Sequence, residues 1–293
     1  MRRGYIDTSR GQIHYHSEGK GDAVVFLHQA LRSGESFSRI LPLVGQHYRA
    51  IAIDLPGRGM SDPLPAPFEV PDMARSVIET LDGLGIKKFR VFGGQTGAAV
   101  SVELAAAYPD RVEGVALLAF PFISDEKMRQ QYVGLAEGGI NTKAAGPGNI
   151  GFPLVEPEAS GAHLARLWHW IAVRLWQGKG IPPQEAMTEE DAGYVSAFLL
   201  DILTAKKGAG INNFYAVFRY NSPVRLPLIK APVLLIQSTG THERTATLRS
   251  QEAAKLIPRA KIASLENADS FANYFKAKEI SDIIVKFFKH PGV

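Results

Sequence analysis

Short apolar runs alternate with amphipathic stretches along most of the chain. The apolar runs predict β-strands at residues 12–17, 23–28, 50–54, 89–92, 114–119, 233–237 and 261–265. The amphipathic stretches predict helices at residues 34–46, 71–84, 97–108, 245–257 and 271–289. This alternation is typical of a mostly parallel sheet that is covered by helices.

The alternation breaks between residues 121 and 225. This stretch contains all three tryptophans, and glycine- and proline-rich joints divide it into helical segments. Ligands of open α/β sheets bind in the crevice at the carboxyl ends of the strands. We therefore interpret residues 121–225 as a helical cap over that edge, and we expect residues 1–120 and 226–293 to form the core domain.

The composition is that of a globular protein with a large core. The chain has 293 residues, 45% of them hydrophobic, and a net charge of +4 from scattered lysines and arginines. Because no basic run stands out, a nucleic-acid partner is not expected. The chain shows neither a signal segment nor an apolar run that could span a membrane, so a cytoplasmic protein without a membrane partner is expected. Whether the protein forms a homodimer is left undecided by the sequence.

The most informative motif surrounds Gln95. Residues 91–99 read V-F-G-G-Q-T-G-A-A, which is the pattern of a nucleophile elbow, G-x-nucleophile-x-G. In such an elbow a sharp strand-to-helix turn lifts the central side chain above a parallel sheet. A carboxamide cannot be deprotonated near neutral pH, so Gln95 is a poor nucleophile.

Three further motifs lie around the elbow in a familiar order. Residues 23–28 read A-V-V-F-L-H, residues 54–62 read D-L-P-G-R-G-M-S-D, and residues 107–112 read A-Y-P-D-R-V. With these motifs the chain resembles the α/β-hydrolase superfamily, and in particular capped members such as epoxide hydrolases, haloalkane dehalogenases and C–C bond hydrolases. The resemblance implies the α/β-hydrolase fold, a mostly parallel eight-stranded sheet flanked by helices, with a helical cap insertion.

The resemblance also implies a catalytic triad in the order nucleophile, acid, histidine. The nucleophile position falls on Gln95, and the acid position falls at Thr241 or its neighbours. The histidine position falls on Ser270, where the family has Gly-His-Phe and this chain has Asp-Ser-Phe. All three positions are replaced, so ordinary ester hydrolysis by the family mechanism is not expected.

The oxyanion hole of the family is made of backbone N–H groups, which do not depend on side chains. In this chain the resemblance assigns it to Thr96 N–H and to the N–H of Gln29 or Ala30, although the family's His-Gly pair is altered to His28-Gln29. A donor of this kind is worth about 10²–10³ in rate. Such a site without a nucleophile suits elimination, decarboxylation, isomerisation or C–C cleavage.

These reactions need a proton acceptor, and several residues are candidates. For His28, at the end of a strand, a structural role is favoured over catalysis. His242 is a loop residue that could act as a base beside Glu243, although a loop histidine is more often only solvated. Asp269 could act as a base if it is buried, because burial raises a carboxylate pKa. His163 lies in a cap segment, where a structural role and a functional role are equally weighted.

The remaining site candidates have structural alternatives. Gln95 could orient a substrate carbonyl, or it could fill the pocket of an inactive enzyme. Trp168, Phe120 and Phe122 could line an apolar pocket, although aromatic residues at helical spacing more often form plain core.

No cofactor and no metal are expected. The chain has no cysteine, which excludes disulfides, thiol chemistry and cysteine-bound metals. The histidines show no i, i+4 pairing, and His14 and His16 alternate on a strand without a clear third ligand.

Three hypotheses about function therefore stay open. The first is an atypical enzyme that acts on a small, partly apolar organic molecule without a covalent intermediate. The second is a non-catalytic protein that binds such a molecule. The third is a hydrolase with displaced catalytic residues, for example Thr96 with His242.

Overall fold

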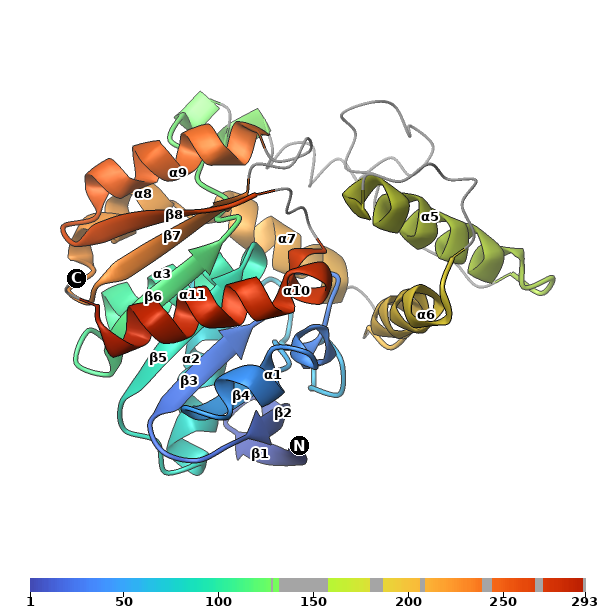
Figure 1. Ribbon diagram of the computed structural model, residues 1–293, viewed down its shortest axis with the longest axis horizontal. Coiled ribbons are helices and arrows are strands. Elements are labelled where there is room, and N and C mark those ends of the chain that lie inside the picture. The colour runs from blue at the N-terminus through green and yellow to red at the C-terminus, as the bar shows by residue number, and fades with distance from the viewer. Residues whose placement is uncertain are drawn as a thin grey trace.

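The computed structural model describes residues 1–127, 129–131, 158–179, 187–205, 209–238, 244–266 and 271–291. In this part of the chain eight strands form one sheet in the order β1-β2-β4-β3-β5-β6-β7-β8 (Figure 1). The strands are β1 (Arg2–Thr8), β2 (Gly11–Glu18), β3 (Ala23–Leu27), β4 (Arg49–Ile53), β5 (Phe89–Gly94), β6 (Val112–Leu118), β7 (Val233–Ser238) and β8 (Ala260–Leu265).

The sheet is antiparallel at one edge and parallel elsewhere. Strand β2 pairs antiparallel with β1 and with β4, and all other neighbouring strands run parallel. The prediction of an eight-stranded, mostly parallel sheet is confirmed. Parallel strands are covered on both faces, which explains why every residue of β3 is buried and apolar.

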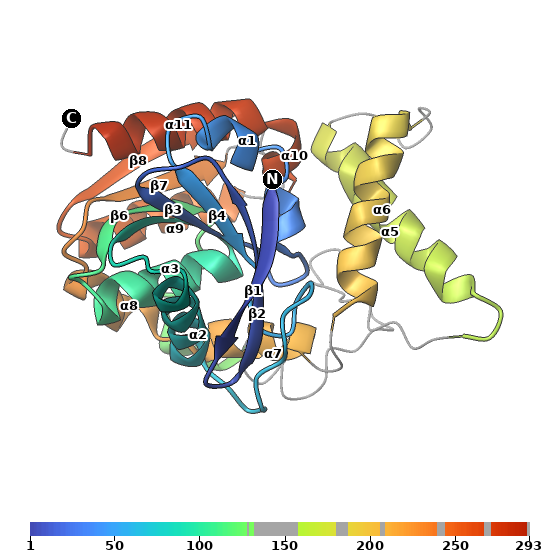
Figure 2. The same ribbon diagram turned by 90° about the horizontal axis from the view of Figure 1, so that it is seen from below.

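Helices cover both faces of the sheet (Figure 2). They are α1 (Leu41–Val44), α2 (Val70–Gly83), α3 (Thr96–Ala107), α9 (Arg244–Leu256), α10 (Ala272–Phe275) and α11 (Ala277–Lys289). Helices α1, α10 and α11 lie on one face, and α2, α3 and α9 lie on the other. Consecutive strand residues point to opposite faces, so Phe26 and Phe92 belong to one core cluster and Val25 and Val91 to the other.

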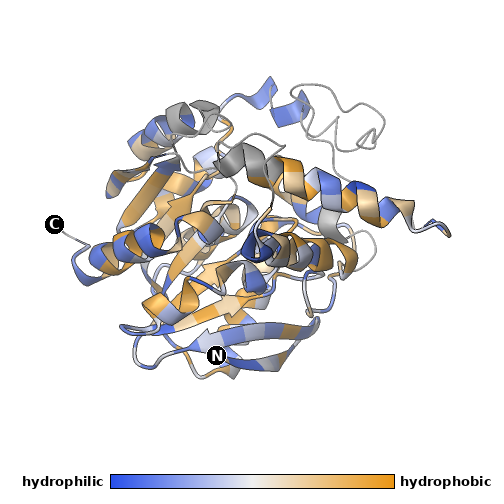
Figure 3. Cartoon of the chain, turned by 45° about the vertical axis from the view of Figure 1, so that its right-hand side comes forward, coloured by the Kyte–Doolittle hydropathy of each residue, from blue (hydrophilic) through white to orange (hydrophobic). Residues whose placement is uncertain are grey.

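The N-terminal hairpin differs from the rest of the sheet. Its strands carry many hydrophilic residues, whereas the central strands are hydrophobic (Figure 3). Strand β1 lies at the edge, and none of its residues is fully buried. An edge strand of this kind needs no continuous apolar run, which explains why the sequence pattern did not predict β1.

Four described helices connect β6 with β7, namely α5 (Ala162–Lys179), α6 (Glu189–Leu203), α7 (Ala209–Arg219) and α8 (Ser222–Arg225). Helices α5 and α6 pack against each other and stand to the right of the sheet in Figure 1. Helices α7 and α8 instead pack on α3, where Arg225 donates to the buried Glu103 at 2.9 Å. The cap boundaries at residues 121 and 225 stay a prediction. No helix in the described part of the chain is both long and apolar enough to cross a membrane.

Two of the predicted helices are wrong in extent. Residues 34–46 form a 3-10 helix, η1 (Gly34–Phe37), and the single turn of α1 in place of one helix. Pro42 lies in the first turn of α1, and a continuous helix cannot pass through it because proline lacks the N–H group. Residues 271–289 divide between α10 and α11 at Lys276, whose φ of −112° and ψ of 24° are not helical.

Candidate functional site

Gln95 occupies the turn between β5 and α3. Its backbone has a φ of 46° and a ψ of −107°, which residues other than glycine rarely adopt. A strained conformation of this kind costs about 1–3 kcal/mol and needs support from its surroundings. Gln95 N–H donates to Leu118 O at 3.0 Å, and Gln95 O accepts from Ala98 N–H at 2.9 Å. The backbone therefore makes the sharp strand-to-helix turn that is typical of an elbow.

Two glycines leave room for this turn. A Cβ atom at Gly93 would lie 2.3 Å from Gly97 O, and a Cβ atom at Gly97 would lie 2.0 Å from Leu27 O. Gly97 N–H also donates to His28 O at 3.0 Å, which ties the elbow to the end of β3. The spacing of the glycines is therefore a packing requirement of the turn.

The residues expected to supply oxyanion donors lie at neighbouring strand ends. Strand β3 pairs in parallel with β5, and Gln29 and Ala30 follow β3 directly. A Cβ atom at Gly94 would lie 3.7 Å from Gln29 Cγ, so Gln29 lies beside the elbow. Thr96 is the first residue of α3, so its N–H has no acceptor within the helix, and the helix N-terminus adds a partial positive charge.

His28 is fully buried beneath this turn. Leu55 N–H donates to His28 Nε2 at 2.9 Å, and His28 Nδ1 donates to Gln29 O at 2.7 Å. Burial lowers the pKa of His28 to about 4, so the ring is neutral at neutral pH. Because both ring nitrogens are engaged by the backbone, neither is left to exchange a proton with a ligand.

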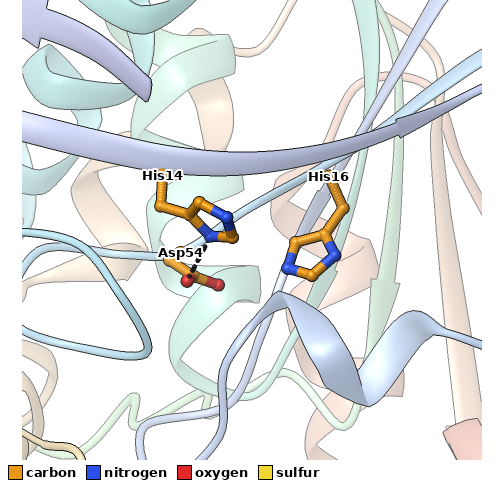
Figure 4. A group of neighbouring side chains, drawn as sticks. All are labelled: His14, His16 and Asp54. Atoms are coloured by element: carbon orange, nitrogen blue, oxygen red, sulfur yellow. Dashed lines mark hydrogen bonds and ion pairs between the residues drawn. The ribbon is translucent and has the colours of Figure 1, made fainter. Parts of the chain in front are cut away.

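Asp54 organises the loop that follows β4. Its carboxylate accepts hydrogen bonds from His14 Nδ1 at 2.9 Å, Gly34 N–H at 2.6 Å and Met60 N–H at 3.0 Å (Figure 4). Burial disfavours the charged carboxylate, but the hydrogen bonds outweigh it and hold the pKa of Asp54 below its usual value. The first residue of the D-L-P-G-R-G-M-S-D motif therefore has a clear structural role.

A buried ion pair joins α6 to the loop after β3. Arg32 Nε donates to Asp201 Oδ2 at 2.8 Å, and Ser33 Oγ donates to Asp201 Oδ1 at 2.5 Å. The Arg32 guanidinium also donates to Tyr194 Oη at 2.5 Å and lies 4.3 Å from the centre of the Phe198 ring. These contacts link the predicted cap to the loop that carries the predicted oxyanion turn.

Arg58 belongs to the same buried cluster. It donates to Arg32 O at 3.3 Å and to Asp201 O at 3.0 Å. Burial lowers the pKa of Arg58 to about 10, which leaves the guanidinium charged at neutral pH. No sequence pattern pointed to this cluster, because Arg32 and Asp201 lie 169 positions apart in the chain.

A cavity of about 220 Å³ lies between η1, α6 and α10. It is lined by Arg32, Glu35, Ser36, Ser38, Arg39, Gly193, Tyr194, Ala197, Asn273 and Tyr274. Among the candidate catalytic residues that the structure describes, which are Gln95, His28 and His163, none lines this cavity. The cavity lies at the junction of the predicted cap and the core.

The aromatic residues expected to line one pocket lie in two clusters. Phe120 and Phe122 are buried in the core cluster on the face of α2 and α3, with ring centres 6.3 Å apart. Trp168 packs on a different cluster, which contains Ile171 and Phe198. Within the described residues, these three side chains do not share a cluster.

His163 lies near the start of α5. Its Nδ1 accepts from Glu158 N–H at 3.1 Å, and Arg166 forms an ion pair with Glu158. These contacts stabilise the turn that leads into the helix. They give His163 Nδ1 a structural partner, and a functional role of this residue stays a prediction.

The other candidate triad positions lie outside the described residues. They are Thr241, His242, Glu243, Asp269 and Ser270. The strands that precede them, β7 and β8, end at Ser238 and Leu265 and run parallel to β5 and β6. The roles of these residues stay predictions.

Comparisons with known proteins agree with this fold. Residues 22–147 match a family described as alpha/beta hydrolase fold. Haloalkane dehalogenase 2 of Mycobacterium tuberculosis is 31% identical over 114 residues, which cover 39% of this chain and 40% of that protein. The 2-hydroxy-6-oxononadienedioate/2-hydroxy-6-oxononatrienedioate hydrolase 2 of Pseudomonas putida is 33% identical over 135 residues, which cover 42% of this chain and 46% of that protein. The chain thus matches less than half the length of these curated relatives.

The likeness to solved structures extends over nearly the whole chain. The enol-lactonase from Burkholderia xenovorans LB400 superposes with a TM-score of 0.72 and covers 98% of this chain and 100% of its own. The two sequences are 18% identical, so this likeness concerns the fold alone.

Proposed function

Since this chain has the α/β-hydrolase fold, we propose that it is an enzyme that acts on a small, partly apolar organic molecule without a covalent intermediate. The observation that carries the proposal is the elbow at Gln95. The backbone keeps the strained turn and its two glycines, while the side chain is a carboxamide that is not a nucleophile near neutral pH. We infer elimination, decarboxylation, isomerisation or C–C cleavage, in which negative charge develops on a substrate oxygen.

In this proposal the elbow binds that oxygen. Thr96 N–H and the N–H of Gln29 or Ala30 donate to it as its charge grows, and each donor contributes about 10²–10³ in rate. The Gln95 carboxamide donates through its NH₂ group to a carbonyl or carboxylate of the substrate and so orients it.

In this proposal the group that accepts a proton from the substrate is a residue of the segments after β7 and β8. These segments contain His242, Asp269 and Ser270, and both follow parallel strands of the same sheet as the elbow. His28 is a poor candidate because both of its ring nitrogens bind backbone groups. Residues 121–225 complete the site as the cap in this proposal.

The proposed substrate class rests on the relatives reported above. They are named for a haloalkane and for an oxo-dienedioate, which are small organic molecules. A small organic molecule is therefore the proposed partner of this protein.

A second candidate is a protein that binds the same class of molecule without converting it. The specific observation in its favour is that neither Gln95 nor His28 offers proton chemistry at the elbow. The two candidates differ in whether the bound molecule is recovered unchanged.

A thermal-shift screen followed by product analysis tests the proposal. The purified protein is screened against small esters, lactones, hydroxyketones, β-keto acids and aromatic carboxylates, because a ligand of the folded state raises the melting temperature. Each hit is then incubated with stoichiometric protein, and mass spectrometry identifies any product. Conversion of a hit supports the proposal that the protein is an enzyme, and the mass of the product identifies the reaction.

A matched pair of variants assigns the activity to the elbow. We expect Gln95→Ala to lower conversion at least 10-fold, since it removes the group proposed to orient the substrate. Gln251→Ala, at an exposed position of α9, is the control and should convert the hit at the wild-type rate. A hit that binds and returns unchanged would favour the binding protein, and equal activity in Gln95→Ala would overturn the role given to Gln95.

A further inference from the structure

Two histidines and an aspartate meet where β2 faces the end of β4. His14, His16 and Asp54 can each offer one ligand atom, and these atoms lie within 4.8 Å of one another. All three residues are buried, with exposed fractions of 5%, 4% and 1%. Figure 4 shows both imidazoles on the same side of β2, with the Asp54 carboxylate beside them.

The geometry and pairing of the strands bring these three residues together. Residues i and i+2 of a strand point to the same face, which places His14 and His16 together. Strand β2 pairs with β4 through Tyr15 and Ile53, and Asp54 N–H donates to His14 O at 3.0 Å, which extends the pairing by one residue. The third ligand, which the strand pattern lacked, is therefore Asp54. It directly follows the neighbouring strand β4 and lies 40 positions from His14.

The hydrogen bonding of His16 is incomplete. Among the residues that the structure describes, none is a hydrogen-bond partner of the buried His16 Nδ1. Glu35 Oε2 lies 4.0 Å from this nitrogen, which is too far for a hydrogen bond. A buried polar atom without a partner is costly, so this nitrogen indicates a ligand that is polar or charged.

We propose that His14, His16 and Asp54 bind a divalent transition metal ion, with Glu35 as a fourth ligand. Two imidazoles and two carboxylates form a donor set that suits Zn²⁺, and the two carboxylates balance its charge. This site is independent of the proposed function, because it shares no residue with the elbow.

The surroundings of Asp54 fit a metal ligand. Gly34 N–H and Met60 N–H donate to its two oxygens and fix the plane of the carboxylate, as outer partners of metal ligands do. Oδ1 keeps a further lone pair for a cation, and Oδ2 regains one when His14 no longer donates to it. On metal binding His14 offers a lone pair to the ion in place of its N–H group, and the proton moves to its other ring nitrogen or to solvent.

Glu35 gives the site a path to solvent. Its side chain is 37% exposed, and it lines the cavity of about 220 Å³ between η1, α6 and α10. Glu35 lines this cavity and lies 4.0 Å from His16 Nδ1, so in this proposal an ion enters the site past Glu35. The ion would join β2, the loop after β4 and the start of η1.

Metal titration of the tag-free, full-length protein tests the proposal. Protein stripped with a chelator is titrated with Zn²⁺ in a calorimeter, and with Co²⁺ while the visible absorption is recorded. We expect saturation at one equivalent, a Co²⁺ spectrum typical of nitrogen and oxygen ligands, and a higher melting temperature with metal.

Two matched histidine variants identify the site. His16→Gln should weaken Zn²⁺ binding at least 10-fold and should keep the fold, because His16 Nδ1 has no hydrogen bond to lose among the described residues. Circular dichroism checks the fold of each variant. His169→Gln, at an exposed position of α5, should bind like the wild type. The proposal is overturned by the absence of saturable binding, by wild-type binding in His16→Gln, or by equal losses in both variants.

Discussion

At the scale of single residues, His28 shows how the fold uses a neutral imidazole. The ring connects the loop after β3 with Leu55 after β4, and it can do so only while Nε2 keeps its lone pair. Protonation of the ring would break the bond from Leu55 N–H and place a charge in the core. The protonation of His28 is therefore coupled to unfolding.

The free energy of unfolding is expected to fall as the pH falls from about 6.5 to about 4. In the unfolded chain His28 takes up a proton near pH 6.5, whereas in the folded protein its pKa is lowered to about 4 by burial. Between these values the unfolded state binds more protons, so stability decreases, by up to about 3 kcal/mol. Above pH 6.5 the ring is neutral in both states. Urea unfolding across this range measures the effect.

Two variants separate this effect from the other titrating groups. Burial also lowers the pKa of His16 to about 4, so His16→Gln should remove part of the pH dependence and leave the part due to His28. His169→Gln should leave the dependence intact, because this side chain is exposed. With chelator present throughout, a constant free energy of unfolding between pH 6.5 and 4 would contradict the assignment.

At the scale of elements, the elbow joins β5, α3 and the end of β3 in one small volume. Helix α3 begins directly after the strained residue, and its first turn packs against the backbone of β3. The packing leaves no space for a Cβ atom at Gly97, whereas a Cβ atom at Gly94 would make only an ordinary contact.

Alanine substitutions at these two glycines should therefore differ. Gly97→Ala places a Cβ atom 2.0 Å from Leu27 O, so we expect a loss of about 3 kcal/mol in the free energy of unfolding, or failure to fold. Gly94→Ala places its Cβ atom 3.7 Å from Gln29 Cγ, an ordinary contact, and should change the free energy by less than about 1 kcal/mol. Urea unfolding of both variants compares them, and equal losses would contradict the packing argument.

At the scale of the whole molecule, the cluster of Arg32, Asp201 and Arg58 fastens α6 to the core. Its charges are almost completely buried, and the aromatic rings of Tyr194 and Phe198 cover the Arg32 guanidinium. A buried charge that loses its partner is strongly destabilising. The position of α6 over the core therefore depends on this cluster.

Asp201→Ala is expected to lower the free energy of unfolding by about 3–5 kcal/mol, because it leaves the Arg32 guanidinium buried without its carboxylate. The amides of α6 should also exchange faster with solvent, which hydrogen–deuterium exchange measures. Arg166→Ala is the control, because it removes an exposed ion pair with Glu158 and should cost less than about 1 kcal/mol. Unchanged exchange in α6 of Asp201→Ala would show that the cluster does not hold the helix.

The central strands and the elbow could be predicted from the sequence. The edge strand β1 and the extents of two helices were not predicted correctly. The apolar runs at residues 23–28 and 50–54 read as buried strands because both faces of a parallel strand are covered. Strand β1 has no such run, because an edge strand is held mainly by its backbone ladder. The break at Pro42 was missed because an amphipathic pattern continues on both sides of it.

The sequence by itself determined the features that depend on neighbours in the chain: the order of strands and helices, and the elbow, whose glycines act within five residues of one another. Only the tertiary structure decided the partners of His28, the ion pair of Arg32 with Asp201, and the meeting of His14 and His16 with Asp54. The physical reason is that a hydrogen bond or an ion pair depends on distance in space. Strand pairing and helix packing set that distance for residues 40 or 169 positions apart, and no local pattern records it.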